Sequence, residues 1–491
     1  PYHQNAPWPV AADGTGHSLT LTRASYGEAD PRAWSASQFI RGTPGAGETP
    51  VADNYAGLVI NEFLTHTDLP QVDYLELYNY STREIDLSGL LLSDTIATNK
   101  FQIPSGTRLA PLGFIHFTET QLGFALSSTG EKIILRNPQA TRVIDAVSFG
   151  PQPNGMALGR FPDGNPAIRQ LAQPTPGIAN AQPRLPAVVI SEIMYNPVSG
   201  NQEEEYLELF NRTGLPVNLR GWRLQDGIGF TFTQDTVLAP FSYLAIAKNL
   251  SVLRANHPGL TTENSIGNFN GNLANDGERV ALERPDMVLS TNGTQIQTNI
   301  VYLLEDEVSY DTGGRWPHWA DGGGSSLELL DLNANNDEAS NWADSDETGK
   351  SEWITIERRG ILTGGSTNFA PTNPSRSLHV LMMDEGEMLL DNVQVFRDGG
   401  PNLVANSSFE AGLKDWVAGG THDRSTVEAG AGANGGSALH IRAEQRGDTA
   451  ANRLRVRLTS GLTNAEIATL RADVRWLRGS PEILLRLHGN Y

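Results

Sequence analysis

Hydrophobic and polar residues alternate in short stretches along most of the chain, and turns separate these stretches. In residues 74–78 and 206–210 the leucines occupy every second position, which is the period of a β-strand. Other apolar runs of strand length lie between Gly, Pro, Asn and Asp residues, at 113–117, 132–135, 243–247 and 279–282. Only residues 251–256 and 464–470 are predicted to form short helices. The pattern therefore predicts an all-β fold built from β-sandwiches.

One set of motifs occurs twice. Its first copy reads INEF, DYLELYN and LSGLLLSD, at residues 60–63, 73–79 and 87–94. Its second copy reads ISEI, EYLELFN and LRGWRLQD, at residues 190–193, 205–211 and 219–226. Such internal similarity indicates two units of the same architecture in series. We expect one domain at residues 57–178 and a second at residues 187–345.

A second repeat runs out of phase with the first. Trp8 and Trp34 recur as Trp316 and Trp342, with the same separation within each pair. The later pair closes a domain whose beginning is visible in the sequence, whereas the earlier pair closes one whose beginning is not. We therefore expect residues 1–48 to be the C-terminal remnant of a preceding module, and the chain to be a section of a larger protein.

Two short segments are predicted to be linkers, because Pro withholds a ladder donor and Gly ends regular strand pairing. They are Gly42–Gly45 and Pro174–Gly177. Linkers of this length and composition favour a semi-rigid rod over a flexible string of domains.

The repeated motifs resemble the lamin-tail domain. The shared features are the Tyr-Leu-Glu-Leu-Tyr/Phe-Asn strand, the Leu-x-Gly-x-x-Leu-x-Asp step, the Asn/Ser-x-Gly-Glu-x-Val/Ile-x-Leu strand and a Leu-Ala-Pro turn at residues 109–111 and 238–240. The resemblance implies immunoglobulin-like β-sandwiches without catalytic activity of their own. It also implies a tendency to occur in large bacterial surface or secreted proteins.

The last third of the chain, residues 351–491, has a different pattern. Residues 401–410 with Trp416 resemble the opening of a carbohydrate-binding-module-like or galactose-binding-like jelly roll, and residues 389–396 resemble its last strand. The closing strand thus precedes the opening one. The region is either one circularly permuted jelly roll or parts of two. We favour the permuted domain, because a half-sandwich of residues 351–400 would expose an apolar face.

Composition narrows the classes of function. Lys and Arg total 36 and Asp and Glu total 56, so the formal charge of −20 disfavours nucleic acid as a partner. The chain has no cysteine, which excludes disulfides, thiolate nucleophiles and zinc-cysteine sites. It also lacks membrane-spanning apolar stretches and the short motifs of hydrolases, kinases and dinucleotide-binding enzymes. The arginines of residues 453–457 share one strand face, where we expect ion pairs or a domain interface rather than DNA binding.

Glutamate pairs recur in both repeats. Glu62 with Glu76, and Glu192 with Glu208, have the residue type of a glycoside-hydrolysing carboxylate pair. A catalytic pair should not be duplicated in two tandem structural modules. We therefore expect these glutamates to be exposed on a sandwich face, where they pair with Arg or Lys on neighbouring strands.

Calcium is the metal that the oxygen-rich sequence fits best. The resemblance to jelly-roll modules implies a structural calcium ion at Asp391 and Glu410, and a plain hydrogen-bonded pair is the alternative. A weaker candidate is the loop with Asp331, Asn333 and Asn335, for which a capped Asx turn is the default interpretation.

Sugar binding would require exposed aromatic rings flanked by hydrogen-bonding groups. Trp476 and His422 are the candidates, whereas Trp416 is expected to belong to the core. His257, His318 and His422 are otherwise expected to be solvated in loops.

Together these observations predict a non-catalytic structural or adhesive section of a large extracellular or cell-surface bacterial protein. Its partners would be other modules of the same polypeptide, other copies of it, or a polysaccharide. The alternative is the carbohydrate-targeting accessory region of an extracellular enzyme whose catalytic domain lies outside this chain.

Overall fold

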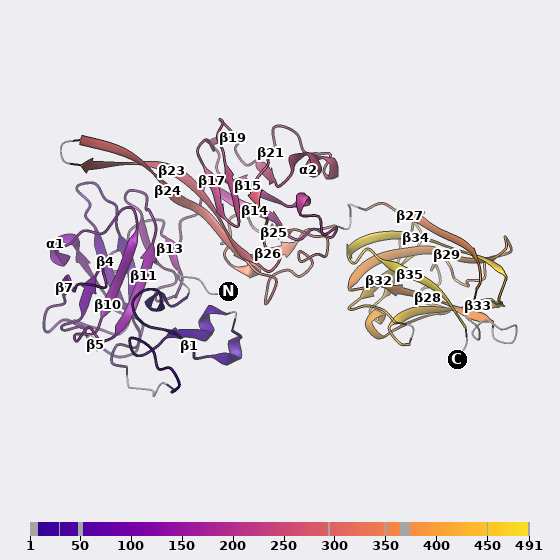
Figure 1. Ribbon diagram of the computed structural model, residues 1–491, viewed down its shortest axis with the longest axis horizontal. Helices are drawn as coiled ribbons and strands as arrows, with labels where there is room; N and C mark the ends of the chain where they lie inside the picture. The colour runs from indigo at the N-terminus through magenta and orange to yellow at the C-terminus, as the bar shows by residue number, and fades with distance from the viewer. Residues whose placement is uncertain are drawn as a thin grey trace.

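The computed structural model describes residues 8–28, 30–47, 53–292, 295–347, 349, 351–363, 374–448 and 450–489. These residues form three β-sandwiches in a row, and an N-terminal hairpin lies beside the first of them (Figure 1). Strands predominate and helices are few and short, so the predicted all-β fold is confirmed.

The first sandwich packs a five-stranded sheet against a four-stranded sheet. The five-stranded sheet has the order β13 (Ile168–Gln170), β12 (Ala157–Arg160), β3 (Leu58–Leu64), β4 (Tyr74–Asn79), β9 (Phe114–Thr118). The four-stranded sheet has the order β11 (Val143–Phe149), β10 (Glu131–Arg136), β6 (Leu91–Ser93), β7 (Phe101–Gln102). The remaining elements are β5 (Ile85–Asp86), β8 (Arg108–Leu109) and α1 (Glu119–Leu122). Alternate residues such as Leu75 and Leu77 face Ile133 and Leu135 in the core, as their sequence period predicts.

The second sandwich repeats this architecture. Its six-stranded sheet has the order β21 (Ser265–Gly267), β20 (Tyr243–Ala247), β15 (Tyr206–Asn211), β14 (Val188–Met194), β25 (Leu327–Leu329), β26 (Trp342–Asp344). Its five-stranded sheet has the order β22 (Asn270–Gly271), β18 (Ile228–Thr231), β17 (Arg223–Asp226), β23 (Glu278–Asn292), β24 (Gln295–Tyr310). The remaining elements are β16 (Val217–Asn218), β19 (Val237–Leu238) and α2 (Leu250–Asn256), which confirms the helix predicted at 251–256. In both sandwiches the first two long strands pair in the same register, with Glu62 opposite Glu76 and Glu192 opposite Glu208.

The N-terminal hairpin consists of β1 (Leu19–Leu21) and β2 (Trp34–Ala36). A 3-10 turn before it, Val10–Ala12, packs on the first sandwich through an apolar cluster with Ile134, Val143 and Ala146. The other 3-10 turns are Ala24–Tyr26, Pro31–Ala33, Gln202–Glu204, Ala339–Asn341 and Gly420–His422. The hairpin therefore rests on the first sandwich without contributing a strand to its sheets.

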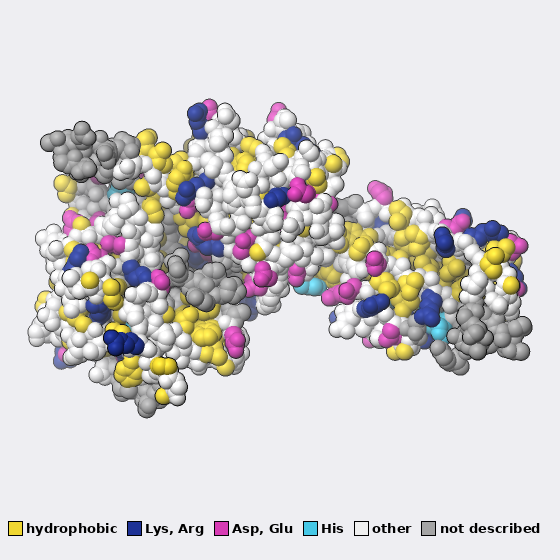
Figure 2. Space-filling model, in the orientation of Figure 1, with side chains coloured by type: hydrophobic (Ala, Val, Ile, Leu, Met, Phe, Trp, Pro, Cys, Tyr) yellow, Lys and Arg dark blue, Asp and Glu magenta, His cyan; other side chains and the backbone are white. Residues whose placement is uncertain are grey.

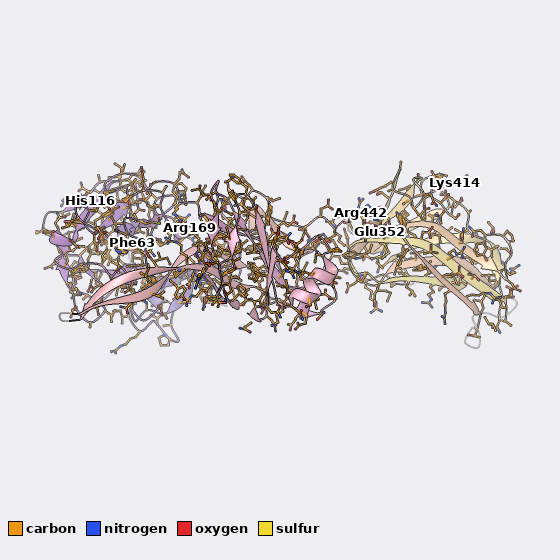
Figure 3. All side chains as sticks on the ribbon, turned by 90° about the horizontal axis from the view of Figure 1, so that it is seen from above. Phe63, His116, Arg169, Glu352, Lys414 and Arg442 are labelled. Atoms are coloured by element: carbon orange, nitrogen blue, oxygen red, sulfur yellow. The ribbon has the colours of Figure 1, made fainter. Side chains whose placement is uncertain are left out.

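The first two sandwiches are in direct contact. The long hairpin β23–β24 reaches from the second sandwich towards the first (Figure 1). Arg184 pairs with Glu305 on this hairpin at 3.3 Å. Arg169, which lies between the two sandwiches in Figure 3, pairs with Asp337. An ion pair from β13 and another from the segment that connects the two sandwiches thus hold the junction.

The C-terminal sandwich also has two sheets. The five-stranded sheet has the order β27 (Ile354–Ile361), β34 (Ile467–Gly479), β29 (Gly386–Arg397), β32 (Ala438–Ala443), β31 (Thr426–Glu428). The four-stranded sheet has the order β30 (Trp416–Gly419), β33 (Arg453–Leu462), β28 (Ser375–Met382), β35 (Ile483–Gly489). Strands from before and after residue 400 share both sheets, so the described residues form one sandwich rather than parts of two.

The helix predicted at residues 464–470 is wrong. The chain turns at Asn464 and Ala465, and β34 begins at Ile467. Ala468 and Ala472 face the core of the C-terminal sandwich, and Leu470 packs against it. Packing against the opposite sheet requires this two-residue period, and it overrides the local helix propensity.

Candidate functional site

The repeated glutamates lie on the outer faces of their sheets, where Glu62 and Glu76 are buried and Glu192 and Glu208 are half-buried. Glu62 and Glu76 are completely buried, and all six residues of β4 are buried. The Tyr74 hydroxyl donates to Glu62 at 2.5 Å, and the Thr175 hydroxyl donates to Glu62 at 2.8 Å. The Gly177 amide donates to Glu76 at 2.5 Å. The prediction of exposed glutamates that pair with Arg or Lys is therefore wrong.

The physical reason is the segment Pro174–Gly177, which was predicted to be a linker. It folds over the outer face of β3 and β4 and supplies amide and hydroxyl donors to the glutamates there. A buried carboxyl that lacks a cationic partner must be hydrogen-bonded, and this segment meets that need. Pro174–Gly177 is thus part of the first sandwich.

Burial also changes the acidity of these groups. It raises the pKa of Glu76 to about 7, against hydrogen bonds from Gly177 and Asn61 that lower it. In the second sandwich, burial together with the charge of Glu192 raises the pKa of Glu208 to about 7. Tyr206 donates to Glu192 at 2.5 Å, as Tyr74 donates to Glu62. In both sandwiches a tyrosine on the neighbouring strand thus satisfies the first glutamate of the pair.

The two residues proposed for calcium hold opposite ends of one loop. Asp391 accepts from the Asn392 amide at 2.6 Å and from the Ala433 amide at 3.0 Å. Glu410 accepts from the amide of Ser437 at 2.8 Å and from its hydroxyl at 3.1 Å. Within the described residues, no group of three or more His, Asp and Glu side chains could hold a metal ion. Plain hydrogen bonding, the alternative considered from the sequence, accounts for both carboxylates.

The weaker calcium candidate is an Asx turn. Asp331 accepts from the Asn333 amide at 2.8 Å, and Asn335 accepts from the Asp337 amide at 3.3 Å. The guanidinium of Arg212 donates to the Asn333 side chain at 3.2 Å. A cationic side chain therefore already occupies the neighbourhood that a calcium ion would need.

Trp476 lies at the junction between the second and third sandwiches. Its indole N–H donates to the Gly479 carbonyl at 2.9 Å. Its ring packs so closely on Gly324 that a Cβ there would lie 2.3 Å from the ring. The Gly479 amide donates to the Gly323 carbonyl at 2.5 Å. Trp476 is thus half-buried in a domain contact, whereas a sugar-binding ring must be exposed.

His422 is completely buried, so the prediction that it is solvated or contacts a sugar is wrong. Its Nε2 accepts from the Met382 amide at 3.0 Å, and burial lowers its pKa to about 4. The other two histidines differ: His257 is half-buried edge-on to Tyr206, and His318 is exposed as predicted. Trp416 lies in the core, as expected.

Several arginines lie together on one surface of the C-terminal sandwich, away from the residues predicted to bind calcium or sugar. We call it the arginine face, and it is the outer face of the four-stranded sheet, with Arg453, Arg455, Arg457, Arg486, His379 and His488. Leu454 and Val456 of β33 point into the core, so the arginines between them point outward. Figure 2 shows Lys and Arg side chains and a histidine on the visible side of this sandwich.

Strand register brings these arginines together. Arg455 of β33 lies opposite His379 of β28, and Arg486 of β35 lies opposite the same histidine on the other side. Directly opposed residues in a sheet have Cβ atoms about 5 Å apart. In the described part of the chain, none of Arg455, Arg457 and Arg486 makes an ion pair with a carboxylate. Among the described residues, the ion pairs predicted for 453–457 are therefore not observed, and the other expectation, a domain interface, stays a prediction.

His379 lies beneath the arginines and is neutral. Only 1% of its surface is exposed, and its ring stacks on His488 with centroids 4.6 Å apart. Burial, together with the charges of Arg453, His488, Arg455 and Arg486, lowers its pKa to about 4. Its Nδ1 atom has no hydrogen-bond partner among the described residues. The positive charge of the face therefore comes from the arginines.

The outer face of the five-stranded sheet is organised differently. We call it the paired face, and it carries Glu387, Glu428, His440, Arg442 and Arg478. Glu387 bonds His440 at 2.7 Å and Arg478 at 2.7 Å. Glu428 bonds His440 at 2.5 Å. Burial alone would raise the pKa of Glu387, but the hydrogen bonds from His440 and Arg478 lower it to about 2.

Sequence reasoning did not identify either face as a unit. The Arg-x-Arg-x-Arg pattern at 453–457 and the isolated Arg486 in an apolar strand were visible signals of outward-pointing arginines. Their lack of carboxylate partners depends on which strands become neighbours. Nothing in the local sequence indicates that His379 and His488 stack.

Comparison with known families supports the account of the first two sandwiches. No curated protein matches the chain. No helix of the described residues is long and apolar enough to span a membrane. The Lamin Tail Domain family matches residues 52–151 and 181–302. These two stretches, which fold as immunoglobulin-like β-sandwiches, are therefore similar to lamin tail domains, which act as structural and interaction modules.

Proposed function

We propose that this chain is a non-catalytic section of an extracellular scaffold that holds an acidic polysaccharide. In this proposal the two lamin-tail-like sandwiches are spacers and protein-contact modules, and the arginine face of the C-terminal sandwich binds the polymer. The observation that carries the proposal is the set of Arg455 and Arg457 on β33 and Arg486 on β35, the two neighbours of β28, without carboxylate partners in the described part of the chain.

The chemistry of the face suits an anionic polymer. A guanidinium group binds a carboxylate or sulfate through two parallel hydrogen bonds. Arg455 and Arg457 are two positions apart on β33, which places them about 7 Å apart. β35, which carries Arg486, lies two strands away from β33, at about 10 Å. A polysaccharide with one acidic group on each sugar unit presents anions at a comparable spacing. The face can therefore contact several units of one chain.

A nucleic acid fits the face less well. Proteins that bind single strands stack the bases on exposed aromatic side chains. The described residues of the arginine face include no exposed Trp, Tyr or Phe, and its two histidines are buried or half-buried. These observations favour acidic sugars.

Domain contacts support the role of the sandwiches as spacers. Arg169 and Asp337 join the first sandwich to the second, and Trp476 packs on Gly324 between the second and the third. Contacts of this kind restrict the relative motion of neighbouring domains. A semi-rigid rod would present the arginine face at a fixed distance from the N-terminal end of the chain.

The test is binding of the chain to alginate, measured by affinity electrophoresis and by titration calorimetry at low salt. We expect saturable binding that weakens with salt, because the contacts are ionic. The variant Arg455→Gln/Arg457→Gln/Arg486→Gln should lose it. The matched control, Arg108→Gln/Arg220→Gln/Arg424→Gln, removes the same charge from exposed arginines elsewhere that already have acidic partners.

Three outcomes would contradict the proposal: no alginate binding, equal loss in both triple variants, or a clear preference of the arginine face for single-stranded DNA. Binding to neutral glycans that survives the arginine substitutions would favour the alternative, an accessory region that targets an extracellular enzyme to carbohydrate. Concentration-dependent self-association, measured by sedimentation velocity, would instead favour a structural scaffold over an accessory region of an enzyme.

A structural calcium ion at Asp391 and Glu410 stays a prediction. Its support is electrostatic: the negative charges of Asp473 and Glu410 help to raise the pKa of Asp391, after burial, and a cation would relieve their repulsion. Melting of the chain with calcium and with a chelator tests it. An unchanged melting temperature would remove the proposed ion.

A further inference from the structure

The N-terminal hairpin has the same internal structure as the hairpin that closes the second sandwich. The register of β1 with β2 equals that of β25 with β26 when 308 is added to each residue number. The ring centroids of Trp8 and Trp34 lie 6.3 Å apart, and those of Trp316 and Trp342 lie 6.2 Å apart, with an interplanar angle of 39° in both pairs. The two hairpins are therefore the same structural unit.

Backbone and side-chain hydrogen bonds agree as well. The Trp34 indole donates to a carbonyl six residues earlier at 2.8 Å, and the Trp342 indole does the same at 2.8 Å. The Ser18 amide donates to the Ser37 hydroxyl at 3.0 Å, as the Ser326 amide donates to the hydroxyl of its own partner at 2.9 Å. The N-terminal hairpin has thus kept the geometry of a closing hairpin.

The two hairpins differ in what lies beside their first strand. β25 pairs on its second edge with β14, where Ile193 lies opposite Leu327. In the described part of the chain β1 pairs with β2 alone. Leu329 at the end of β25 is 8% exposed, whereas Leu21 at the same position of β1 is 37% exposed. Among the described residues, no strand covers the edge of the N-terminal hairpin that corresponds to the edge covered by β14 in the second sandwich.

The free edge presents backbone groups suited to strand addition. The Ser37 amide donates to the Ser18 carbonyl at 2.7 Å, and the Thr22 amide donates to the Ala33 carbonyl at 2.8 Å. Residues at even positions of β1 thus bond β2. In an antiparallel ladder the residues between them, Leu19 and Leu21, direct their N–H and C=O groups to the other edge. An incoming strand would meet these groups.

We propose that this edge of β1 binds one antiparallel β-strand, supplied by a lamin-tail-like sandwich that lacks a closing hairpin of its own. The two sandwiches described above cannot supply it, because β3 and β14 are each paired on both edges. Binding completes a sheet in the partner, as β25 completes the sheet of the second sandwich. The hairpin is then a connector between modules.

Ser18 of the hairpin favours an incoming strand that carries a glutamate. In the second sandwich the Ser326 hydroxyl donates to Glu192 of β14 at 2.5 Å. Ser18 is the equivalent residue of the N-terminal hairpin, and it is exposed where Ser326 is buried. The proposed strand therefore carries a glutamate between apolar residues, in the pattern of Ile190–Ile193.

The test uses a fluorescent peptide with the sequence of residues 187–196, AVVISEIMYN, titrated with the whole chain and followed by anisotropy. We expect saturable binding. Leu19→Pro removes an amide donor from the free edge, where proline is tolerated, and should weaken binding at least about tenfold. The matched control Thr20→Val changes a residue whose backbone bonds β2, and it should bind the peptide normally.

Ser18→Ala supplies a second test that does not alter the backbone. It should weaken binding of the peptide about tenfold, because it removes a hydrogen bond to a charged group. It should have no effect on a peptide with Glu192→Ala, which binds weakly to both proteins. Absence of peptide binding would overturn the proposal. An affinity for the peptide that neither Leu19→Pro nor Ser18→Ala changes would also overturn it.

Discussion

The two outer faces of the C-terminal sandwich both carry arginines and histidines. On one face these side chains are paired with carboxylates, and on the other the arginines have no such partner among the described residues. On the paired face Glu387 lies between His440 and Arg478, and its pKa is lowered to about 2 by these partners in spite of burial. On the arginine face Arg455 and Arg486 flank a neutral histidine. The charged groups of the paired face have partners within that face, whereas Arg455, Arg457 and Arg486 have no carboxylate partner in the described part of the chain.

The difference shows that charge type along a strand does not decide the role of a face. Both β33 and β34 carry three arginines, at 453, 455 and 457 in β33 and at 471, 475 and 478 in β34. Neighbouring strands place Glu387 beside the arginines of the five-stranded sheet, and they place His379 and Ser377 beside those of the four-stranded sheet. Cross-strand register therefore decides which arginines have a carboxylate neighbour.

The largest effect should come from giving the arginine face its own carboxylates. Val417 lies opposite Arg455, and Ser377 lies opposite Arg457. Val417→Glu with Ser377→Glu should reduce alginate affinity about 100-fold, since the new pairs occupy the guanidinium groups. Val417→Thr with Ser377→Thr is the control of similar polarity. Calorimetric titration measures both, and an affinity equal to that of the original chain would remove the arginine face as the binding site.

The next largest effect, a loss of stability, should come from removing the central carboxylate of the paired face. Glu387→Gln leaves His440 and Arg478 without their central carboxylate, and it should destabilise the C-terminal sandwich by about 2 kcal/mol. Arg455→Gln on the other face should change stability by less than about 0.5 kcal/mol. Urea unfolding followed by tryptophan fluorescence compares the two variants. Equal effects would show that the two faces do not differ in internal pairing.

Dependence on pH should separate carboxylates that have cationic partners from those that do not. The pKa of Glu387 is lowered from 4.5 to about 2, so the stability that it contributes is present above pH 4.5 and is lost as the pH falls towards 2. Burial raises the pKa of Glu76 and Glu208 from 4.5 to about 7. Their contribution is present below pH 4.5 and is lost as the pH rises through 7.

Scanning calorimetry between pH 3 and pH 8 measures this dependence. The transition of the C-terminal sandwich should move down at the acid end, and those of the lamin-tail-like sandwiches should move down at the alkaline end. Glu76→Gln assigns the transition of the first sandwich and should flatten its dependence between pH 5 and 8. Transitions that all shift in the same direction would contradict the assignment of these pKa values.

The smallest effect on binding should come from the domain junction. A Cβ at Gly324 would lie 2.3 Å from the Trp476 ring, so Gly324→Ala should loosen the contact between the second and third sandwiches. Alginate affinity should change less than about twofold, because the junction is separate from the arginine face. Small-angle scattering should report a wider distribution of shapes. Gly349→Ala, which has open space around it, is the control.

Local patterns were sufficient for the architecture of the first two sandwiches. Alternating leucines placed Leu75 and Leu77 in a core, and the repeat placed Glu192 and Glu208 in the same register as Glu62 and Glu76. Local patterns were not sufficient to predict whether those glutamates are exposed or buried. The burial of Glu62 and Glu76 depends on Pro174–Gly177, which lies about 100 residues away along the chain and folds over them.

The candidate site divides in the same way. The outward direction of Arg453, Arg455 and Arg457 follows from the two-residue period of β33. That these arginines lack acidic neighbours could not be predicted, because β28 and β35 contribute to the face from distant parts of the sequence. The environments of His422 and Trp476 could not be predicted for a related reason. His422 is buried in a core and Trp476 lies at a domain junction, and the neighbouring residues in the sequence indicate neither position.

The sequence by itself determined the strand period, the duplication and the identity of the closing hairpins, because each depends on residues that are near one another or that recur at fixed spacing. Only the tertiary structure decided which carboxylates are buried, which arginines have partners and which edge of β1 is free. These properties depend on contacts between strands far apart in the chain, and only the assembled sheets bring those strands together.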